Sequence, residues 1–275
     1  MLADVLPYLT CPHCGADLAP AGTAVRCASG HGFDVARQGY VNLLAGRAAA
    51  DGDSAEMVAA RAEFLDAGHY APITRAVVEA AAGATGGCVA DLGAGTGHHL
   101  AAVLDADTSR VGLALEVSKP ALRRAARAHP RLGAVGCDAW AALPVRAGAI
   151  SVVLNVFAPR NTAELDRILA PDGVLVVVVP TTDHLAGLVA DLGLLTVAPD
   201  KAQRVAEQLA PALSVSTQDP CEFELALSHA DVLSLVGMGP SAWHIGPAAL
   251  AQRVAALPEP VHTTASVVVT AFRRA

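Results

Sequence analysis

Apolar runs of valine, leucine and alanine alternate with helical segments from residue 88 onwards, and this alternation restricts the fold more than any other feature of the chain. Continuous runs of this kind are typical of buried parallel strands in a sheet that helices cover on both faces. Strands are predicted within residues 88–95, 110–118, 131–138, 149–159 and 174–180, and helices within 98–106, 119–130 and 162–173. Two further strands, at 221–228 and 263–272 with a helical segment between them, suit an antiparallel edge. We therefore expect an α/β fold.

Four residues near the start of the chain have the spacing of zinc ligands. Cys11, Cys14, Cys27 and His31 form the pattern C-x2-C, twelve residues, then C-x3-H. Closed zinc sites use four thiolate or imidazole ligands in a tetrahedron, and ligand pairs two to four residues apart are their usual sequence form. Disulfide-bonded or inert cysteines are the alternative, but nothing marks the chain as secreted, and Pro12 suits a tight ligand-bearing turn. The pattern predicts a structural zinc ion.

A glycine-rich turn follows the first strand of the alternating region. Glycines at 93, 95 and 97 let the backbone pass close under a ligand, and the following helix points its N-terminus at that ligand. Asp91, which leads the turn, can accept from an ammonium group or a bound water. Glu116 and Asp138 end the next two strands, where carboxylates suit ribose hydroxyls and the adenine.

A glycine turn alone is shared with dinucleotide-binding folds, so an NAD enzyme is one alternative. The joint placement of the three carboxylates resembles instead the class I S-adenosylmethionine-dependent methyltransferases. That resemblance implies a Rossmann-like, seven-stranded sheet with an antiparallel edge, preceded here by the small zinc-binding domain. The cofactor-binding residues that we expect from the turn and the strand ends are Asp91, Gly93, Gly95, Thr96, Gly97, Glu116 and Asp138.

Several longer blocks resemble the bacterial 23S rRNA (guanine-N1)-methyltransferase family. The blocks are Phe33-Asp34, Gly39–Leu44, Asp53–Met57, Arg61 and Phe64–Tyr70. Asn155–Asn161 and Met238–His244 resemble the tylosin-resistance branch of that family. The resemblance covers essentially the whole chain.

The resemblance implies three regions with separate tasks. Residues 1–45 would be a zinc-binding domain that recognises an RNA hairpin, 46–75 a linker and connecting helix, and 76–275 the methyltransferase domain. Cys11, Cys14, Cys27 and His31 would hold the zinc, and Tyr70, Thr96, Gly97 and His184 fall where the family contacts the cofactor. The implied substrate is a guanine in the hairpin 35 region of 23S rRNA, and the implied consequence is resistance to macrolides of the tylosin type.

The end of the fourth predicted strand is where this enzyme class holds its target nitrogen. We expect the Asn155 side chain or nearby backbone carbonyls to orient the base, and Phe157 to stack on it. The alternative is that Asn155 satisfies backbone groups and Phe157 packs in the core. Trp243 is either part of the substrate wall or a core anchor, and the core is the favoured position.

The charge of the chain fits an RNA-binding protein poorly. Its formal net charge is −7, and its only lysines are Lys119 and Lys201. Because phosphate contacts dominate RNA affinity, so sparse a basic footprint predicts weak, salt-sensitive binding. A paralogue that methylates a small molecule and a non-enzymatic zinc-ribbon binding protein are therefore kept as alternatives. The sequence shows no membrane span and no signal peptide, so we expect a cytoplasmic protein without a membrane partner, and a homodimer is left open.

Overall fold

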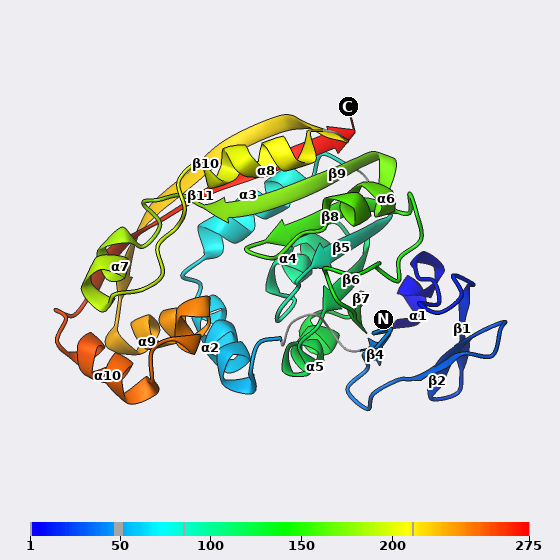
Figure 1. The fold of residues 1–275 in the computed structure, drawn as a ribbon, viewed down its shortest axis with the longest axis horizontal. Coiled ribbons are helices and arrows are strands. Elements are labelled where there is room, and N and C mark those ends of the chain that lie inside the picture. The colour runs from blue at the N-terminus through cyan, green and yellow to red at the C-terminus, as the bar shows by residue number, and fades with distance from the viewer. Residues whose placement is uncertain (1, 47–51, 85, 211, 275) are drawn as a thin grey trace.

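The computed structural model describes residues 2–46, 52–84, 86–210 and 212–274, so residues 47–51 of the predicted linker lie outside the described residues. Its main feature is an eight-stranded sheet with the strand order β10-β11-β9-β8-β5-β6-β7-β4 (Figure 1). Strands β9, β8, β5, β6, β7 and β4 run parallel, while β11 and β10 are antiparallel to their neighbours. The predicted parallel sheet with an antiparallel edge is confirmed, and β4 adds a short eighth strand.

The central strands β5 to β9 of this sheet are largely buried because helices cover both of their faces. In chain order the bounds of the eight strands are β4 Val41–Asn42, β5 Cys88–Leu92, β6 Val111–Glu116, β7 Leu132–Gly136, β8 Ile150–Val156, β9 Leu169–Pro180, β10 Leu213–Leu227 and β11 Val261–Arg274. Alternate residues of β5 belong to different apolar clusters, Val89 to one and Cys88 and Ala90 to the other. This alternation is expected because successive side chains of a strand point to opposite faces.

Helices from different parts of the chain cover the two faces. One face carries helices α3 Ala71–Ala81, α4 His98–Ala106 and α5 Lys119–Ala128. The other carries α1 Leu2–Val5, the 3-10 turn η1 Leu6–Tyr8, α6 Thr162–Ile168 and α8 Lys201–Leu209. Apolar residues at helical spacing make these contacts, for example Ile73 and Val77 of α3, which are fully buried. No helix among the described residues is long and apolar enough to span a membrane.

A lobe of helices stands beside the carboxyl ends of the parallel strands. It contains α2 Ala55–Asp66, α7 Ala186–Leu192, α9 His229–Gly237, the 3-10 turn η2 Pro240–Trp243 and α10 Pro247–Ala255. Ser54 caps α2 by accepting from the Met57 N–H, as expected of a serine at a helix start. Helix α2 packs against α9, where the Ser234 hydroxyl donates to Glu63 at 3.0 Å. The lobe thus joins α2, which precedes β5 in the chain, to α9, which lies near the end of the chain.

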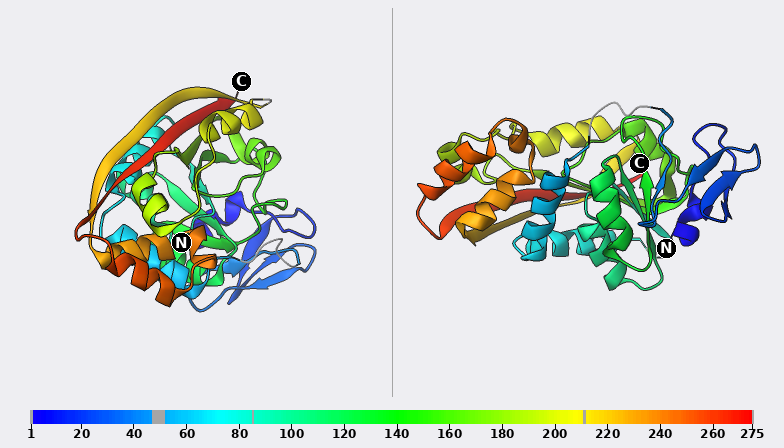
Figure 2. Two further views of the ribbon diagram at one scale, coloured as in Figure 1. Left: turned by 60° about the vertical axis from the view of Figure 1, so that its left-hand side comes forward. Right: turned by 90° about the horizontal axis from the view of Figure 1, so that it is seen from below.

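The N-terminal zinc-binding module is docked on the sheet at the end opposite this lobe (Figure 2). It holds the three short strands β1 Leu18–Ala21, β2 Ala24–Cys27 and β3 Gly32–Asp34. Beyond them, β4 pairs with β7, and the Leu43 N–H donates to the Gly136 carbonyl at 2.8 Å. Arg146 donates to the Pro7 carbonyl at 3.0 Å and pairs with Asp17 at 2.8 Å. These contacts fix the module to the sheet edge.

Two sequence-based element boundaries are wrong. The helix predicted over 162–173 ends at Ile168, and β9 begins at Leu169, because Pro171 cannot continue a helix and disfavours helical backbone at the residue before it. Gly173 therefore lies inside β9 and does not end the helix. The strand predicted at 221–228 begins at Leu213, eight residues earlier, and its first half is mostly exposed, which removed the apolar signal.

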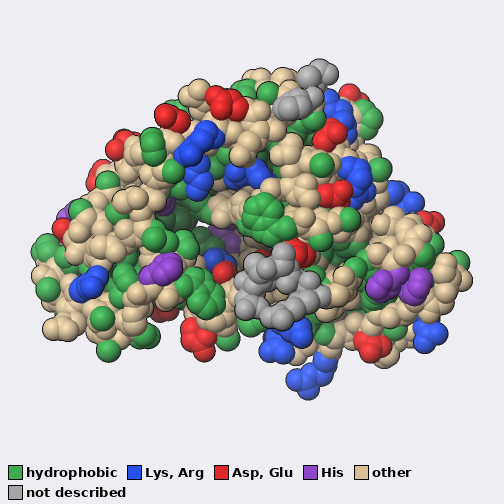
Figure 3. All heavy atoms as spheres, viewed as in Figure 1, with side chains coloured by type: hydrophobic (Ala, Val, Ile, Leu, Met, Phe, Trp, Pro, Cys, Tyr) green, Lys and Arg blue, Asp and Glu red, His purple; other side chains and the backbone are tan. Residues whose placement is uncertain are grey.

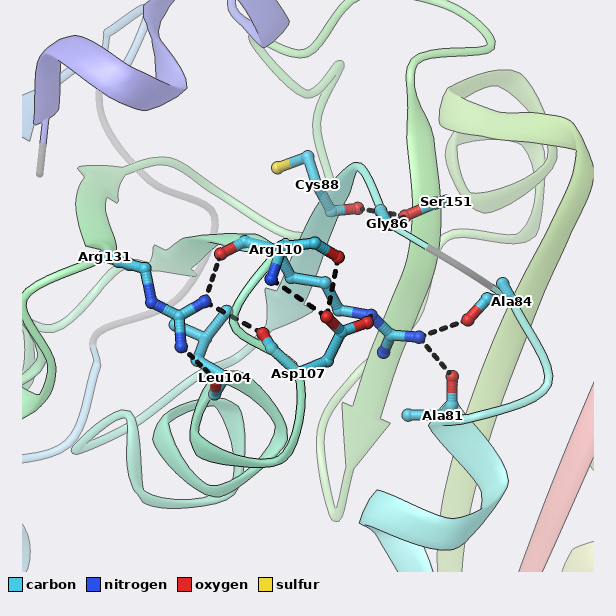
Figure 4. A network of polar contacts seen from close by, with 10 residues as sticks. Ala81, Ala84, Gly86, Cys88, Leu104, Asp107, Arg110, Arg131 and Ser151 are labelled. Carbon is cyan, nitrogen blue, oxygen red and sulfur yellow. Dashed lines mark hydrogen bonds and ion pairs between the residues drawn. The ribbon is translucent and has the colours of Figure 1, made fainter.

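A buried arginine joins the sheet to two helix ends (Figure 4). The Arg110 side chain is almost completely buried, pairs with Asp107 at 2.8 Å, and donates to the carbonyls of Ala81 and Ala84. Arg131 donates to the Arg110 carbonyl at 2.6 Å and to the Leu104 carbonyl. The two guanidinium groups satisfy carbonyls at the ends of α3 and α4 that have no partner within their helices.

Replacing Arg110 should therefore destabilise the fold. Arg110→Met removes the donors of two carbonyls and the partner of Asp107, and we expect it to lower the free energy of unfolding by about 2 to 4 kcal/mol. Urea unfolding followed by circular dichroism measures the loss. Arg124→Met on the exposed side of α5 is the matched control and should change the value by less than about 0.5 kcal/mol. Equal losses in the two variants would contradict this role of Arg110.

Candidate active site and metal centre

The four predicted metal ligands meet in the N-terminal module. Their ligand atoms all lie within 4.8 Å of one another, and none of the cysteines forms a disulfide. His31 Nδ1 lies 3.5 Å from the Cys11 sulfur and 3.4 Å from the Cys27 sulfur, and the sulfurs of Cys14 and Cys27 are 3.6 Å apart.

These separations fit a tetrahedral zinc ion. Zinc–sulfur bonds of about 2.3 Å and zinc–nitrogen bonds of about 2.0 Å place tetrahedral ligand atoms about 3.5 to 3.8 Å apart. The Gly15 N–H donates to the Cys11 carbonyl and the Gly30 N–H to the Cys27 carbonyl, so both ligand pairs lie on tight turns. Three thiolates and one imidazole make a closed, structural site with no position for a reacting water.

A cavity of about 290 Å³ lies at the carboxyl ends of β5, β6 and β8. The chain goes from β5 to β6 and β7 on one side and returns to β8 on the other, so this is the point where the strand order reverses. Ligands of open α/β sheets bind at such a point. Seven of the residues predicted to bind cofactor line the cavity, namely Tyr70, Asp91, Gly93, Gly95, Thr96, Glu116 and Asp138.

Two predicted cofactor residues lie elsewhere. Gly97 does not line the cavity but starts α4 with a φ of +80°, and a Cβ there would lie 3.2 Å from the Ala128 side chain. It therefore serves the turn and its packing against α5. His184 lines a larger neighbouring cavity and contacts Tyr70, whose hydroxyl lies 3.2 Å from its Nε2.

Glu116 shapes the glycine turn from the neighbouring strand. One carboxylate oxygen accepts from the Gly95 N–H at 2.9 Å, and the other accepts from the N–H groups of Val117 and Ser118 at 2.7 and 2.8 Å. Gly93 has a φ of +76°, and a Cβ there would come within 2.6 Å of the Ala158 side chain. A side chain at this position would force apart the ends of β5 and β8.

Asp91 is a carboxylate in an unfavourable position. It is buried at the end of β5, and none of the described residues donates a hydrogen bond to its side chain. Burial, with a smaller contribution from the nearby Glu116 charge, raises the pKa of Asp91 to about 7. An ammonium group in the cavity would stabilise the ionised Asp91 carboxylate, so the site fits a cofactor that carries an amino acid.

Aromatic side chains separate the two cavities. Tyr70 and Phe157 line both, and the Phe157 ring packs beside Tyr70 and His184 with centroid distances of 6.3 and 5.9 Å. The Ser266 N–H donates to His184 Nδ1 at 3.1 Å, and burial lowers the pKa of His184 to about 4. The neutral ring therefore carries its proton on Nε2 and donates it to the Tyr70 hydroxyl.

Phe157 is exposed and held in a strained conformation. Its side chain is 43% exposed, so it does not pack in the core. Its φ is +53°, a left-handed conformation that costs a non-glycine residue about 1 to 3 kcal/mol. The Phe157 N–H donates to the Val178 carbonyl at 3.2 Å, which ties the strained residue to β9.

Asn155 lines neither cavity, and the role of its side chain in orienting the base stays a prediction. The residue is fully buried, and its amide donates to the Pro159 carbonyl at 2.9 Å. Its carbonyl oxygen accepts from Arg160 Nε at 3.0 Å. Of the two roles that the sequence left open, the structure favours the one in which Asn155 satisfies groups of its own loop, and it also positions Arg160.

Sequence reasoning gave no role to two residues that line the first cavity, Arg61 and Trp140. Arg61 forms an ion pair with Asp53 and donates to the Met238 carbonyl at 2.7 Å, which joins α2 to the end of α9 over the cavity. Trp140 lies two residues beyond Asp138 and is 56% exposed. An aromatic residue just after a strand-end carboxylate was the available signal. Trp243 is 60% exposed, so its predicted place in the core is wrong.

The larger cavity, of about 710 Å³, lies between the sheet and the lobe. Leu188 and Val189 of α7, Val205 of α8 and Leu235 of α9 give it apolar walls. Figure 3 shows a hollow on this face, with lysine and arginine side chains gathered on the side of α8. Because Arg61, Tyr70, Phe157 and Met238 line both cavities, a group bound in one would meet a group bound in the other.

The sequence resembles known proteins over its whole length. Residues 9–47 match the zinc-ribbon family described as RlmA, N-terminal. A protein of Micromonospora griseorubida named as a 23S rRNA (guanine-N1)-methyltransferase is 54% identical over 99% of both chains. The 23S rRNA (guanine(748)-N1)-methyltransferase of Streptomyces fradiae is 50% identical over 99% of both chains.

Solved structures share the fold at low sequence identity. A chain from the complex of the Haloferax volcanii Trm112 methyltransferase activator with a methyltransferase aligns with a TM-score of 0.55 and 18% identity, covering 82% of this chain and 99% of that one. The YcgJ protein of Bacillus subtilis aligns with a TM-score of 0.52 and 12% identity, covering 74% and 98%. The architecture is that of the class I S-adenosylmethionine-dependent methyltransferases, as the sequence predicted.

Loss of one ligand should empty the metal centre. Cys14→Ser replaces a thiolate by a hydroxyl that binds zinc poorly, so we expect elemental analysis to fall from about one zinc per chain to a small fraction of that. Cys221→Ser, a half-buried cysteine outside the cluster, is the control and should keep its zinc. Full zinc content in Cys14→Ser would argue against these four ligands.

Cofactor affinity should depend on pH through Asp91. A carboxylate with a pKa of about 7 in the free protein is mostly protonated at pH 6 and mostly ionised at pH 8. If the ionised form binds the ammonium group, S-adenosylhomocysteine should bind about tenfold more tightly at pH 8 than at pH 6 by calorimetry. Asp91→Asn should bind more weakly and without this dependence. Equal affinity of the wild type at both pH values would refute this role.

Proposed function

This chain belongs to the 23S rRNA (guanine-N1)-methyltransferase family, and from this premise we propose that it transfers a methyl group from S-adenosylmethionine to N1 of a guanine in 23S rRNA. The observation that carries the proposal is the 50% identity to the Streptomyces fradiae enzyme over 99% of both chains. The two adjoining cavities support it, since the smaller suits a cofactor and the larger a base. This sequence identity favours the rRNA substrate over the small-molecule alternative, which rests on the acidic net charge of the chain.

The smaller cavity offers a partner for each part of the cofactor. Asp91 would accept from the ammonium group, and Glu116, held by three backbone N–H groups, would face the ribose hydroxyls. Asp138 and the exposed Trp140 lie where the adenine would rest. S-adenosylmethionine supplies an electrophilic methyl group on a sulfonium. The residues named here bind and orient it and exclude water.

The larger cavity would hold the target guanine against Phe157. N1 lies on the Watson–Crick edge, so the base has to leave its duplex before it can react. Transfer would form the N1–methyl bond as the sulfur–methyl bond breaks, leaving S-adenosylhomocysteine, and the N1 proton would pass to solvent. An in-line displacement of this kind gains most from alignment, and the strained Phe157 between the two cavities is placed to align the base.

The zinc-binding module would recognise an RNA hairpin, with the hairpin 35 region as the expected target and tylosin-type macrolide resistance as the consequence. Its docking on the sheet through β4 and Arg146 supports this division of tasks, because a fixed module can set the distance between hairpin and cavity. A ribosomal substrate also implies a cytoplasmic enzyme. The homodimer left open by the sequence stays a prediction.

Primer extension tests the proposal. We expect purified enzyme with S-adenosylmethionine to produce a reverse-transcription stop at one guanine of deproteinised 23S rRNA, because a methyl group on N1 blocks base pairing. Labelled methyl groups found only in a small-molecule extract would refute the proposal.

Phe157→Ala separates the role of the ring from the fold. Stacking of a base on an aromatic side chain contributes about 1 to 3 kcal/mol, so kcat/KM for RNA should fall about ten- to hundredfold. Val215→Ala, an exposed apolar residue of β10, is the control and should retain wild-type activity. Wild-type kcat/KM in Phe157→Ala would contradict the stacking role.

A further inference from the structure

The larger cavity carries the opposite charge to the chain as a whole. Four cations line it, Arg61, Arg160, Lys201 and Arg204, and no carboxylate is among its described lining residues. The chain has a formal net charge of −7. The cavity therefore carries a local excess of positive charge in a chain whose net charge is negative.

Three of these cations have no acidic partner within the described part of the chain. Arg61 is neutralised by Asp53, whereas Arg160, Lys201 and Arg204 form no ion pair there. Arg204 donates to the Pro199 carbonyl at 2.7 Å, and Arg160 is held by Asn155 at 3.0 Å. A backbone carbonyl and the Asn155 side chain thus hold the two guanidinium groups at the cavity without cancelling their charge.

The cluster is electrostatically unfavourable without a ligand. Lys201 and Arg204 lie three residues apart on α8, so their side chains share one side of the helix. Burial, and then the charges of Arg160 and Arg204, lower the pKa of Lys201. A group of like charges that stays unpaired beside a large cavity is suited to an anionic ligand.

We propose that Arg160, Lys201 and Arg204 bind the RNA backbone phosphates that flank the guanosine inserted into the larger cavity. This inference rests on the proposed function. The walls of the cavity are apolar and aromatic, which suits a base, while the cations suit phosphate oxygens. Arginine can contact two phosphate oxygens at once, and Asn155 fixes the orientation of one such guanidinium.

The site also explains how an acidic chain can bind RNA. Phosphate contacts position a nucleic acid without reading its sequence, and a few of them suffice if they lie beside the reacting nucleotide. These residues lie on the methyltransferase body, away from the zinc-binding module to which sequence reasoning assigned RNA recognition.

Salt-dependent RNA binding tests the site. Lys201→Gln/Arg204→Gln and Arg160→Gln should each weaken binding to deproteinised 23S rRNA about tenfold, and each lost contact should make the plot of log affinity against log salt shallower by about 1. S-adenosylhomocysteine affinity should stay unchanged. The matched control, Arg123→Gln/Arg124→Gln on α5, removes the same charge outside the cavity and should keep the wild-type slope.

The outcomes separate this proposal from the proposed function. Equal losses in the α5 control and the α8 variant would mean a general charge effect and would overturn the site. Wild-type rRNA methylation with unchanged affinity in the α8 variant overturns the site but leaves the function intact. Absence of rRNA methylation by the wild type overturns both.

A double-mutant cycle tests the positioning role of Asn155. Asn155→Ala should raise the KM for RNA in the wild-type background and have little further effect in the Arg160→Gln background, since its contribution passes through that guanidinium. A purely structural Asn155 would give additive effects in the cycle and lower the stability of both backgrounds equally, which would contradict the positioning role.

Discussion

The reversal of strand order between β5 and β8 is the constraint on which the rest of the structure depends. The chain continues from β5 to β6 on one side of this point and from β8 to β9 on the other side. The carboxyl ends of β5 and β8 therefore stand open, and their last residues face a cavity. Asp91 ends β5, Phe157 follows β8, and Gly93 lets the two ends approach. The two cavities proposed for cofactor and base are adjacent because both are built on this opening.

The lobe and the zinc-binding module add to this opening the parts that the proposed reaction on RNA would need. The lobe adds the second cavity and carries Arg61 across it, while the module lies at the opposite end of the sheet. Strand pairing and Arg146 fix the module to the sheet. The hairpin site proposed for the module and the two cavities would therefore lie at a set separation. Positive charge at the larger cavity, from Arg160, Lys201 and Arg204, gives the acidic chain a local patch of opposite sign.

Local spacing decided what the sequence could predict. The metal ligands, the glycine turn and the strand-end carboxylates follow from neighbours along the chain, and the structure brings them together. Asn155 and Trp243 depend on tertiary contacts that no spacing reveals, so the first was assigned to the base and the second to the core. The cluster of Arg160, Lys201 and Arg204 was missed because Arg160 and α8 are far apart in sequence and only the fold brings them together.

The central claim is that cofactor and target base occupy the two adjoining cavities and meet at Phe157. A crystal structure of the enzyme with S-adenosylhomocysteine and an RNA hairpin tests it most directly. The account predicts the homocysteine amino group at Asp91, the sulfur facing the Phe157 side of the smaller cavity, and an unpaired guanine in the larger one. A cofactor in the larger cavity, or a base that enters by another surface, would contradict it.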